Sequence, residues 1–141
     1  MASTRMLTWA SLAVAVLVVL QLGSPVEGGS DKLAYVKKVV AENKLVIFSK
    51  SYCPYCRRAK SVFENMKETP FVIELDERDD GDAIQQALGK FIGRRTVPQV
   101  FINGEHIGGS DDTVAAEQSG KLKKLLKASS VRQEESFKSE L

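Results

Sequence analysis

Two cysteines, Cys53 and Cys56, stand three positions apart and are the only cysteines in the chain. A disulfide between them would close a loop too short to restrict the unfolded chain much, so the pair is better explained by chemistry than by stability. A Cys-x-x-Cys pair serves either thiol–disulfide exchange or zinc binding, and a zinc site needs two further cysteine or histidine ligands. His106 is the single histidine. The sequence therefore favours redox chemistry and predicts no metal site.

The residues around the pair indicate a division of roles. An apolar run at 45–48 predicts a buried strand, and a helical pattern follows in which Pro54 suits the first turn. A cysteine at a helix start meets unpaired N–H groups and the positive end of the helix dipole, and Lys50 adds a cation nearby. These features favour the thiolate and lower its pKa. We expect Cys53 to be the nucleophile that attacks a disulfide. Cys56, one helical turn later, is expected to be the thiol that resolves the mixed disulfide.

The elements that must position this pair can be read along the chain. Helical spacing of apolar residues predicts helices over residues 31–43, 53–66, 82–88, from 113 onward, and 121–127. Short apolar runs predict strands over 45–48, 71–75, 97–102 and 105–107. Ser30 or Asp31 is expected to cap the first helix, and Asn103-Gly104 is a two-residue hairpin signal. This order predicts an α/β domain: a four-stranded mixed sheet flanked by helices.

Length and composition describe one globular domain. The chain has 141 residues, 43% of them hydrophobic and 27% charged, and its net charge is +2. Lys and Arg are spread along the chain, which argues against a nucleic-acid binder because such proteins carry a basic face or run.

Both chain ends carry targeting hints. Residues 1–28 combine Arg5 with an apolar run over 12–20 and helix breakers at 23–25, as in a cleaved signal peptide or a signal anchor. Residues 138–141 differ at one position from the endoplasmic reticulum retrieval tetrapeptide. They are interpreted either as a retrieval signal or as a solvated tail that resembles one by chance. We expect the protein to be located in the secretory pathway, either in the lumen of the endoplasmic reticulum or secreted, with a cytoplasmic location as the alternative. Membrane contact is expected only if the leader stays as an anchor, and a flexible tail is predicted over 128–141.

Three segments resemble dithiol glutaredoxins of the CPYC class, in order and at the family's spacing: residues 50–56, 93–102 and 108–112. The likeness runs through a domain expected over 29–127, and the hydrophobic leader is similar to that of plant members. It implies a thioredoxin fold with Pro98 in cis. It also implies a glutathione-dependent oxidoreductase, which reduces protein–glutathione mixed disulfides through Cys53 alone and protein disulfides through Cys53 and Cys56.

The resemblance further implies a glutathione groove. Its residues are Lys50, Tyr55, Gln85, Thr96, Val97, Pro98, Gly109, Ser110, Asp111 and Asp112. Lys50 and Gln85 would take the glycine carboxylate and Tyr55 would line the groove, while the backbone of residues 96–97 would pair with the cysteinyl segment. The start of the helix after Gly109 would take the γ-glutamyl group, although the two aspartates there also suit simple helix capping.

The resemblance also sets expectations about partners. It implies no bound cofactor, glutathione as co-substrate, and glutathionylated or disulfide-containing proteins as partners of a monomer. A thioredoxin-like enzyme would differ in its electron donor. An iron–sulfur cluster protein, as a glutathione-ligated dimer, is the other alternative, and Pro54 weighs against it because proline stiffens the loop.

Overall fold

The structure is a computed structural model that describes residues 28–139. All of the predicted leader except Gly28, and the last two residues of the C-terminal tetrapeptide, lie outside the described residues. The helices are α2 (Gly28–Glu42), α3 (Pro54–Asn65), α4 (Gly81–Ile92), α5 (Ser110–Gln118) and α6 (Lys121–Ser139), with a 3-10 turn η1 (Leu75–Glu77). The strands are β1 (Leu45–Ser49), β2 (Phe71–Glu74), β3 (Gln99–Ile102) and β4 (Glu105–Gly108).

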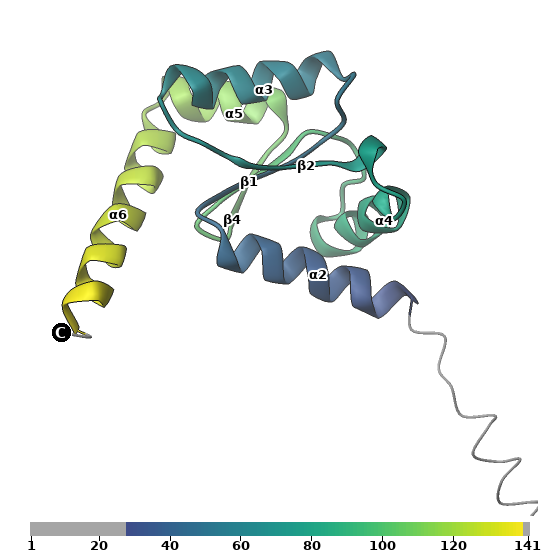
Figure 1. The fold of residues 1–141 in the computed structure, drawn as a ribbon. Helices are drawn as coiled ribbons and strands as arrows, with labels where there is room; N and C mark the ends of the chain where they lie inside the picture. Colours follow the sequence, from purple (N-terminus) through teal and green to yellow (C-terminus); the bar gives the residue numbers. More distant parts are fainter. Residues whose placement is uncertain (1–27, 140–141) are drawn as a thin grey trace, which may run out of the picture.

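The four strands form one mixed sheet in the order β2-β1-β3-β4. β1 pairs in parallel with β2 and antiparallel with β3, which pairs antiparallel with β4. Helices α2 and α4 lie on one side of the sheet, and α3 and α5 on the other (Figure 1). The predicted α/β class, with a four-stranded mixed sheet between helices, is confirmed.

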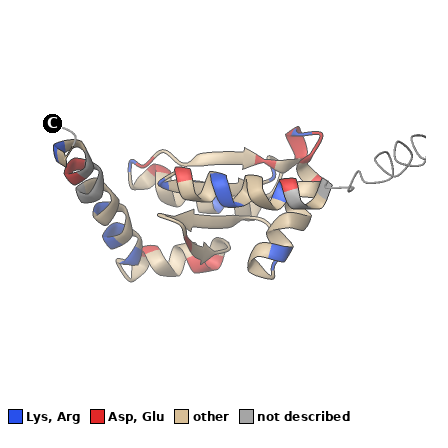
Figure 2. Ribbon diagram, turned by 90° about the horizontal axis from the view of Figure 1, so that it is seen from below, with Lys and Arg blue, Asp and Glu red and all other residues tan. Residues whose placement is uncertain are grey.

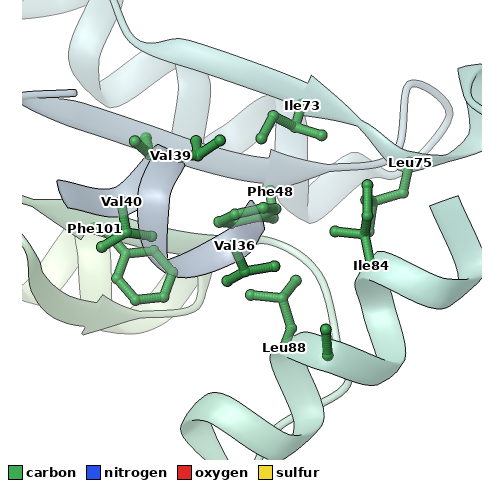
Figure 3. Packing of buried hydrophobic residues seen from close by; sticks show 11 residues of the cluster. Val36, Val39, Val40, Phe48, Ile73, Leu75, Ile84, Leu88 and Phe101 are labelled. Carbon is green, nitrogen blue, oxygen red and sulfur yellow. The ribbon is translucent and has the colours of Figure 1, made fainter. Parts of the chain in front are cut away.

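The two faces of β1 explain its continuous apolar run. Val46 and Phe48 point into the core beneath α2 and α4, where Phe48 meets Phe101 edge to face at a ring-centroid distance of 5.8 Å (Figure 3). Leu45 and Ile47 point into the opposite core with α3, α5 and α6. Because this central strand is covered on both faces, the four successive residues 45–48 are all apolar, and no alternation is visible in the sequence.

The hairpin between β3 and β4 confirms the signal at Asn103-Gly104. Both residues have positive φ, 52° at Asn103 and 82° at Gly104, as a two-residue turn of type I′ requires. Charged residues of both signs are distributed over the helices, with several lysines along α6 (Figure 2). Within residues 28–139, none of the helices has the length and apolar character needed to cross a bilayer.

Several element boundaries differ from those predicted: α5 starts at Ser110 and not at residue 113, and α4 continues to Ile92 instead of ending near residue 88. α2 already includes Ser30 and Asp31, so neither residue caps it. β2 stops at Glu74 because Leu75 begins the 3-10 turn, and β3 starts only after Pro98, which has no N–H to donate to a neighbouring strand.

The largest difference concerns the end of the chain. The last helix was predicted to end near residue 127 and a mobile tail to follow, but α6 continues to Ser139. The segment contains neither glycine nor proline and is rich in helix-forming Lys, Arg, Gln and Glu. Its serines are accommodated because the hydroxyls of Ser129 and Ser130 donate back to the Leu126 carbonyl, within the same helix. The predicted end of the last helix near residue 127 was therefore wrong, because residues 128–139 continue it.

Candidate active site

Cys53 lies at the end of the loop that connects β1 to α3. It is the N-cap residue of α3 in extended conformation, and Pro54 occupies the first turn, as predicted. Cys53 is partly exposed, whereas Cys56, one turn into the helix, is fully buried. Both cysteines are free thiols.

The surroundings of Cys53 favour its thiolate. Partial burial alone raises the pKa of the Cys53 thiol, but hydrogen bonds from the Cys56 N–H, the Cys56 thiol and the Tyr55 N–H, together with the charge of Arg57, outweigh that effect and lower it. The sequence suggested Lys50 as the cation that favours the Cys53 thiolate, but in the structure this cation is Arg57. The Lys50 charge acts instead on Asp76, where it helps to lower the carboxyl pKa.

Cys56 has the opposite character. Burial raises the pKa of the Cys56 thiol, and its hydrogen bond to Cys53 raises it further, while contacts with the Lys50 backbone and the Ser49 hydroxyl oppose the rise only in part. The arrangement therefore favours the thiolate at the partly exposed Cys53 and the protonated thiol at the buried Cys56.

The loop at residues 96–98 contains the Val97–Pro98 peptide, which is cis, as the resemblance implied. Pro98 is buried, Val97 half-buried and Thr96 exposed. A Cβ added to Gly109 would lie 3.6 Å from the Pro98 carbonyl oxygen, so the turn before α5 lies against this loop. The side chain of Gln85, in α4, also reaches the segment, because its Nε2 donates to the Arg95 carbonyl at 2.6 Å.

The first turn of α5 carries two carboxylates and a hydroxyl. Asp112 caps the helix by accepting the Gly109 N–H at 3.0 Å, and this bond, with Arg94, lowers the pKa of its carboxyl. Asp111 is highly exposed and pairs with Arg58 of α3 at 2.6 Å. The Ser110 hydroxyl is buried and has no hydrogen-bond partner among the described residues. An unpartnered donor at a helix start is suited to an anionic group.

The other groove residues implied by the resemblance lie around Cys53. Tyr55, in the first turn of α3, is 62% exposed, and Lys50 is half-buried in the loop before Cys53. In the described part of the chain, no group of three or more His, Cys, Asp or Glu side chains is arranged to hold a metal ion.

Sequence reasoning missed Asp76, Gln99 and the role of His106. Asp76 could have been found, because residues that follow parallel neighbouring strands meet at one edge of the sheet. Gln99 and His106 gave no comparable signal, because their importance depends on side-chain contacts: His106 Nε2 lies 2.8 Å from Gln99 Oε1, and Gln99 Nε2 donates to the Thr96 carbonyl.

The sequence is similar to that of known glutaredoxins. The glutaredoxin family model matches residues 45–107. Glutaredoxin-C4 of Arabidopsis thaliana is 53% identical over 131 residues, covering 93% of this chain and 96% of that protein. Glutaredoxin-C8 of Oryza sativa subsp. japonica is 57% identical over 116 residues, covering 81% of this chain and 85% of that protein.

Solved structures agree with these sequence relatives. The crystal structure of a buckwheat glutaredoxin–glutathione complex has a TM-score of 0.71 at 44% identity, covering 74% of this chain and 96% of that one. The oxidized glutaredoxin 2 of Chlamydomonas reinhardtii has a TM-score of 0.67 at 45% identity, covering 72% of this chain and 95% of that one. The likeness therefore holds in sequence and in fold.

Proposed function

The chain belongs to the glutaredoxin family, and on this premise we propose how its own residues carry out glutathione-dependent thiol–disulfide exchange. The protein is a glutathione-dependent thiol–disulfide oxidoreductase of the plant dithiol type. One observation supports the assignment of roles above all others: the pKa of the partly exposed Cys53 thiol is lowered and that of the buried Cys56 thiol is raised. A thiolate is the nucleophile in disulfide exchange, so Cys53 attacks first.

On a protein–glutathione mixed disulfide, the Cys53 thiolate attacks the sulfur of the glutathione moiety. The protein–glutathione bond breaks, the protein leaves as a thiolate that takes a proton from water, and Cys53 carries the glutathione. The thiolate of a second glutathione then attacks the glutathione sulfur, which releases glutathione disulfide and restores the Cys53 thiolate. This route does not use Cys56.

On a disulfide within a protein, attack by Cys53 leaves it joined to one of the two protein sulfurs. Cys56 loses its proton, attacks the Cys53 sulfur and displaces the protein as a thiol. The product is a Cys53–Cys56 disulfide, which two glutathione molecules reduce in turn. The hydrogen bond between the two thiols supports this step, because it brings the second sulfur against the first.

We propose that the γ-glutamyl end of glutathione binds at the start of α5. The buried, unpartnered Ser110 hydroxyl and the helix N-terminus support an α-carboxylate there, and Asp111 supports the α-ammonium once it releases Arg58. Gly109 and Asp112 shape that turn. The backbone of Thr96 and Val97, beside Pro98, would pair with the cysteinyl segment. Lys50, Gln85 and Tyr55 complete the groove at its glycine end.

The protein partners and the compartment are part of the proposal. Glutathionylated and disulfide-containing proteins are the proposed substrates, with the enzyme acting as a monomer. The apolar run at 12–20 and the C-terminal tetrapeptide support a secretory location, where the more oxidising lumen would let the same exchange run in either direction. A fusion tagged internally, with both ends of the chain native, tests this location, and a cytoplasmic signal would contradict it.

The functional experiment uses the full chain and two serine variants. Reduction of a glutathionylated peptide is followed through glutathione, glutathione reductase and NADPH oxidation. Cys53→Ser is expected to abolish the activity and Cys56→Ser to keep it, while both variants lose reduction of an intraprotein disulfide. Full activity of Cys53→Ser would overturn the assignment.

A further inference from the structure

A line of hydrogen-bonded side chains connects the β3–β4 hairpin to the loop at 96–98. His106 Nε2 lies 2.8 Å from Gln99 Oε1. Gln99 Nε2 donates to the Thr96 carbonyl oxygen at 2.9 Å and reaches the Thr96 hydroxyl at 3.3 Å. Gln99 is only 1% exposed, and a buried amide is tolerated only when its donor and acceptor are both paired. Here both ends of the amide are paired.

The direction of these bonds follows from the chemistry of the groups. A carbonyl oxygen can only accept, so the amide nitrogen of Gln99 must face Thr96 and its oxygen must face His106. Because that oxygen also only accepts, His106 carries a hydrogen on Nε2. His106 itself is fixed by its neighbour across the strands, since its ring lies 5.0 Å from the Phe101 ring, centroid to centroid. The line therefore runs one way, from His106 through Gln99 to Thr96.

The Thr96 carbonyl controls the direction of a second group. Within one peptide plane, the C=O of residue 96 and the N–H of residue 97 point in opposite directions when the bond is trans. The cis bond in this segment is the next one, Val97–Pro98. Gln99 holds the Thr96 carbonyl toward the buried side of the loop, so the Val97 N–H faces the opposite side, where the substrate backbone would pair.

We propose that Gln99, oriented by His106, is a positioning residue that aims the Val97 N–H at the cysteinyl backbone of the glutathione moiety. The inference rests on the proposed function, because it concerns the same groove. Without the bond from Gln99, the peptide plane between Thr96 and Val97 can rotate. The main-chain pairing with substrate would then weaken equally before and during sulfur exchange. Loss of such uniform binding raises KM and leaves kcat unchanged.

The test uses Gln99→Met, which keeps the length of the side chain and removes its donor and acceptor, together with His106→Phe and His106→Gln. His106→Phe keeps a ring against Phe101 but cannot donate to Gln99, whereas His106→Gln restores an amide N–H near the lost Nε2. Glu105→Gln is the matched control, because Glu105 neighbours His106 on β4 but pairs with Lys121 at 2.8 Å. Kinetics on a glutathionylated peptide and the amide NMR signal of Val97 are the readouts.

We expect Gln99→Met to raise KM roughly three- to tenfold, the effect of one buried hydrogen bond, with kcat unchanged and the Val97 amide signal shifted. His106→Phe should do the same to a smaller extent, His106→Gln should recover, and Glu105→Gln should match the wild type. In the wild type, nitrogen-15 NMR should find the hydrogen of His106 on Nε2.

Three results would overturn the inference: an unchanged KM in Gln99→Met, a loss of kcat at constant KM, or a His106 hydrogen on Nδ1. If Gln99→Met does not fold, the His106→Phe and His106→Gln pair decides by the same criteria. A wild-type protein without glutathione-dependent activity would instead contradict the proposed function, so the two failures are distinguishable.

Discussion

The Asp76 carboxylate accepts two hydrogen bonds from Ser51, one from its backbone N–H at 2.9 Å and one from its hydroxyl. Ser51 lies in the loop that follows β1, two residues before Cys53, and Asp76 lies in η1, which follows β2. The pair ties the loop that carries the reactive thiol to the neighbouring strand. In the same loop the Cys53 N–H donates to the Lys50 carbonyl at 3.1 Å.

We predict that Asp76→Ala lowers kcat/KM on a glutathionylated peptide by about two- to tenfold, because the loop loses both anchoring bonds. The bonds to the Ser51 hydroxyl and N–H lower the pKa of the Asp76 carboxyl. The anchor is therefore complete throughout the neutral range and is lost only as the pH falls below the ordinary range of an aspartate. Asp79→Ala, at an exposed aspartate nearby, is the control, and equal activity of the two variants would contradict the prediction.

The lowered pKa of Cys53 makes a prediction about alkylation. Burial opposes the thiolate, and the Cys56 N–H, the Cys56 thiol, the Tyr55 N–H and Arg57 favour it. Removing a favourable group must raise the pKa, so a higher pH is needed for rapid reaction with iodoacetamide. Cys56→Ala should shift the midpoint of the rate upward, and Arg57→Gln should shift it less.

Cys56→Ser is the matched control, because a serine hydroxyl can still donate to the Cys53 sulfur. Its midpoint should lie below that of Cys56→Ala. The rate against pH is measured on each variant with Cys53 as the reacting thiol. Identical midpoints for the alanine and serine variants would show that the side chain of Cys56 does not stabilise the thiolate.

The sequence alone was informative where structure is decided locally. The Asn103-Gly104 turn needs positive φ at two positions, and only a few residue types tolerate this, so the hairpin was predictable. The start of α3 was predictable for a similar reason, because Pro54 suits the first helical turn and nothing later in the chain changes that preference. The cis bond at Pro98 came from the resemblance and not from the local sequence.

The rest depends on contacts between distant segments. The charge of Arg57 lowers the pKa of the Cys53 thiol, whereas the charge of Lys50 helps to lower that of the Asp76 carboxyl, 26 positions further along the chain. The spacing of apolar residues in the sequence does not show that Lys50 and Asp76 lie close together. The buried Gln99 is similar, since a glutamine at the start of an apolar strand gives no sign that a histidine on the next strand orients it.

The ion pair between Lys60 of α3 and Glu74 of β2 predicts a stability effect. Their side chains are only 20% and 19% exposed, and Glu74 Oε2 is buried with no hydrogen-bond partner within residues 28–139. Lys60→Met would leave a half-buried carboxylate without its cation. We expect a loss of about 2 kcal/mol in the free energy of unfolding, between the values for exposed and for fully buried pairs.

The double variant Lys60→Met with Glu74→Met should recover much of that loss, because no unpaired charge remains. Lys38→Met is the control, since Lys38 and Glu42 are 69% and 61% exposed at 3.9 Å and their pair should contribute less than about 0.5 kcal/mol. Urea unfolding measures all three variants. A Lys60→Met variant as stable as Lys38→Met would contradict the prediction.

Gly81, the first residue of α4, leaves no room for a side chain. A Cβ built there would lie 1.8 Å from the Leu75 carbonyl oxygen and 2.7 Å from its carbon, both backbone atoms of η1. A backbone group cannot move aside as the end of a flexible side chain can. Gly81→Ala must therefore push α4 and η1 apart, and we expect it to lower the free energy of unfolding by about 3 kcal/mol.

Gly29→Ala in α2 is the matched control for Gly81→Ala. The nearest atom to its added Cβ would be the flexible Lys90 Nζ at 3.6 Å, and alanine is the better helix former, so this change should stabilise the fold by about 0.5 kcal/mol or leave it unchanged. Because η1 also carries Asp76, the displaced turn in Gly81→Ala should release Ser51 and reduce activity in the fraction that still folds. Urea unfolding and the peptide assay on both variants measure the two effects. A Gly81→Ala protein with wild-type stability would show that the packing of α4 on η1 is looser than these contacts indicate.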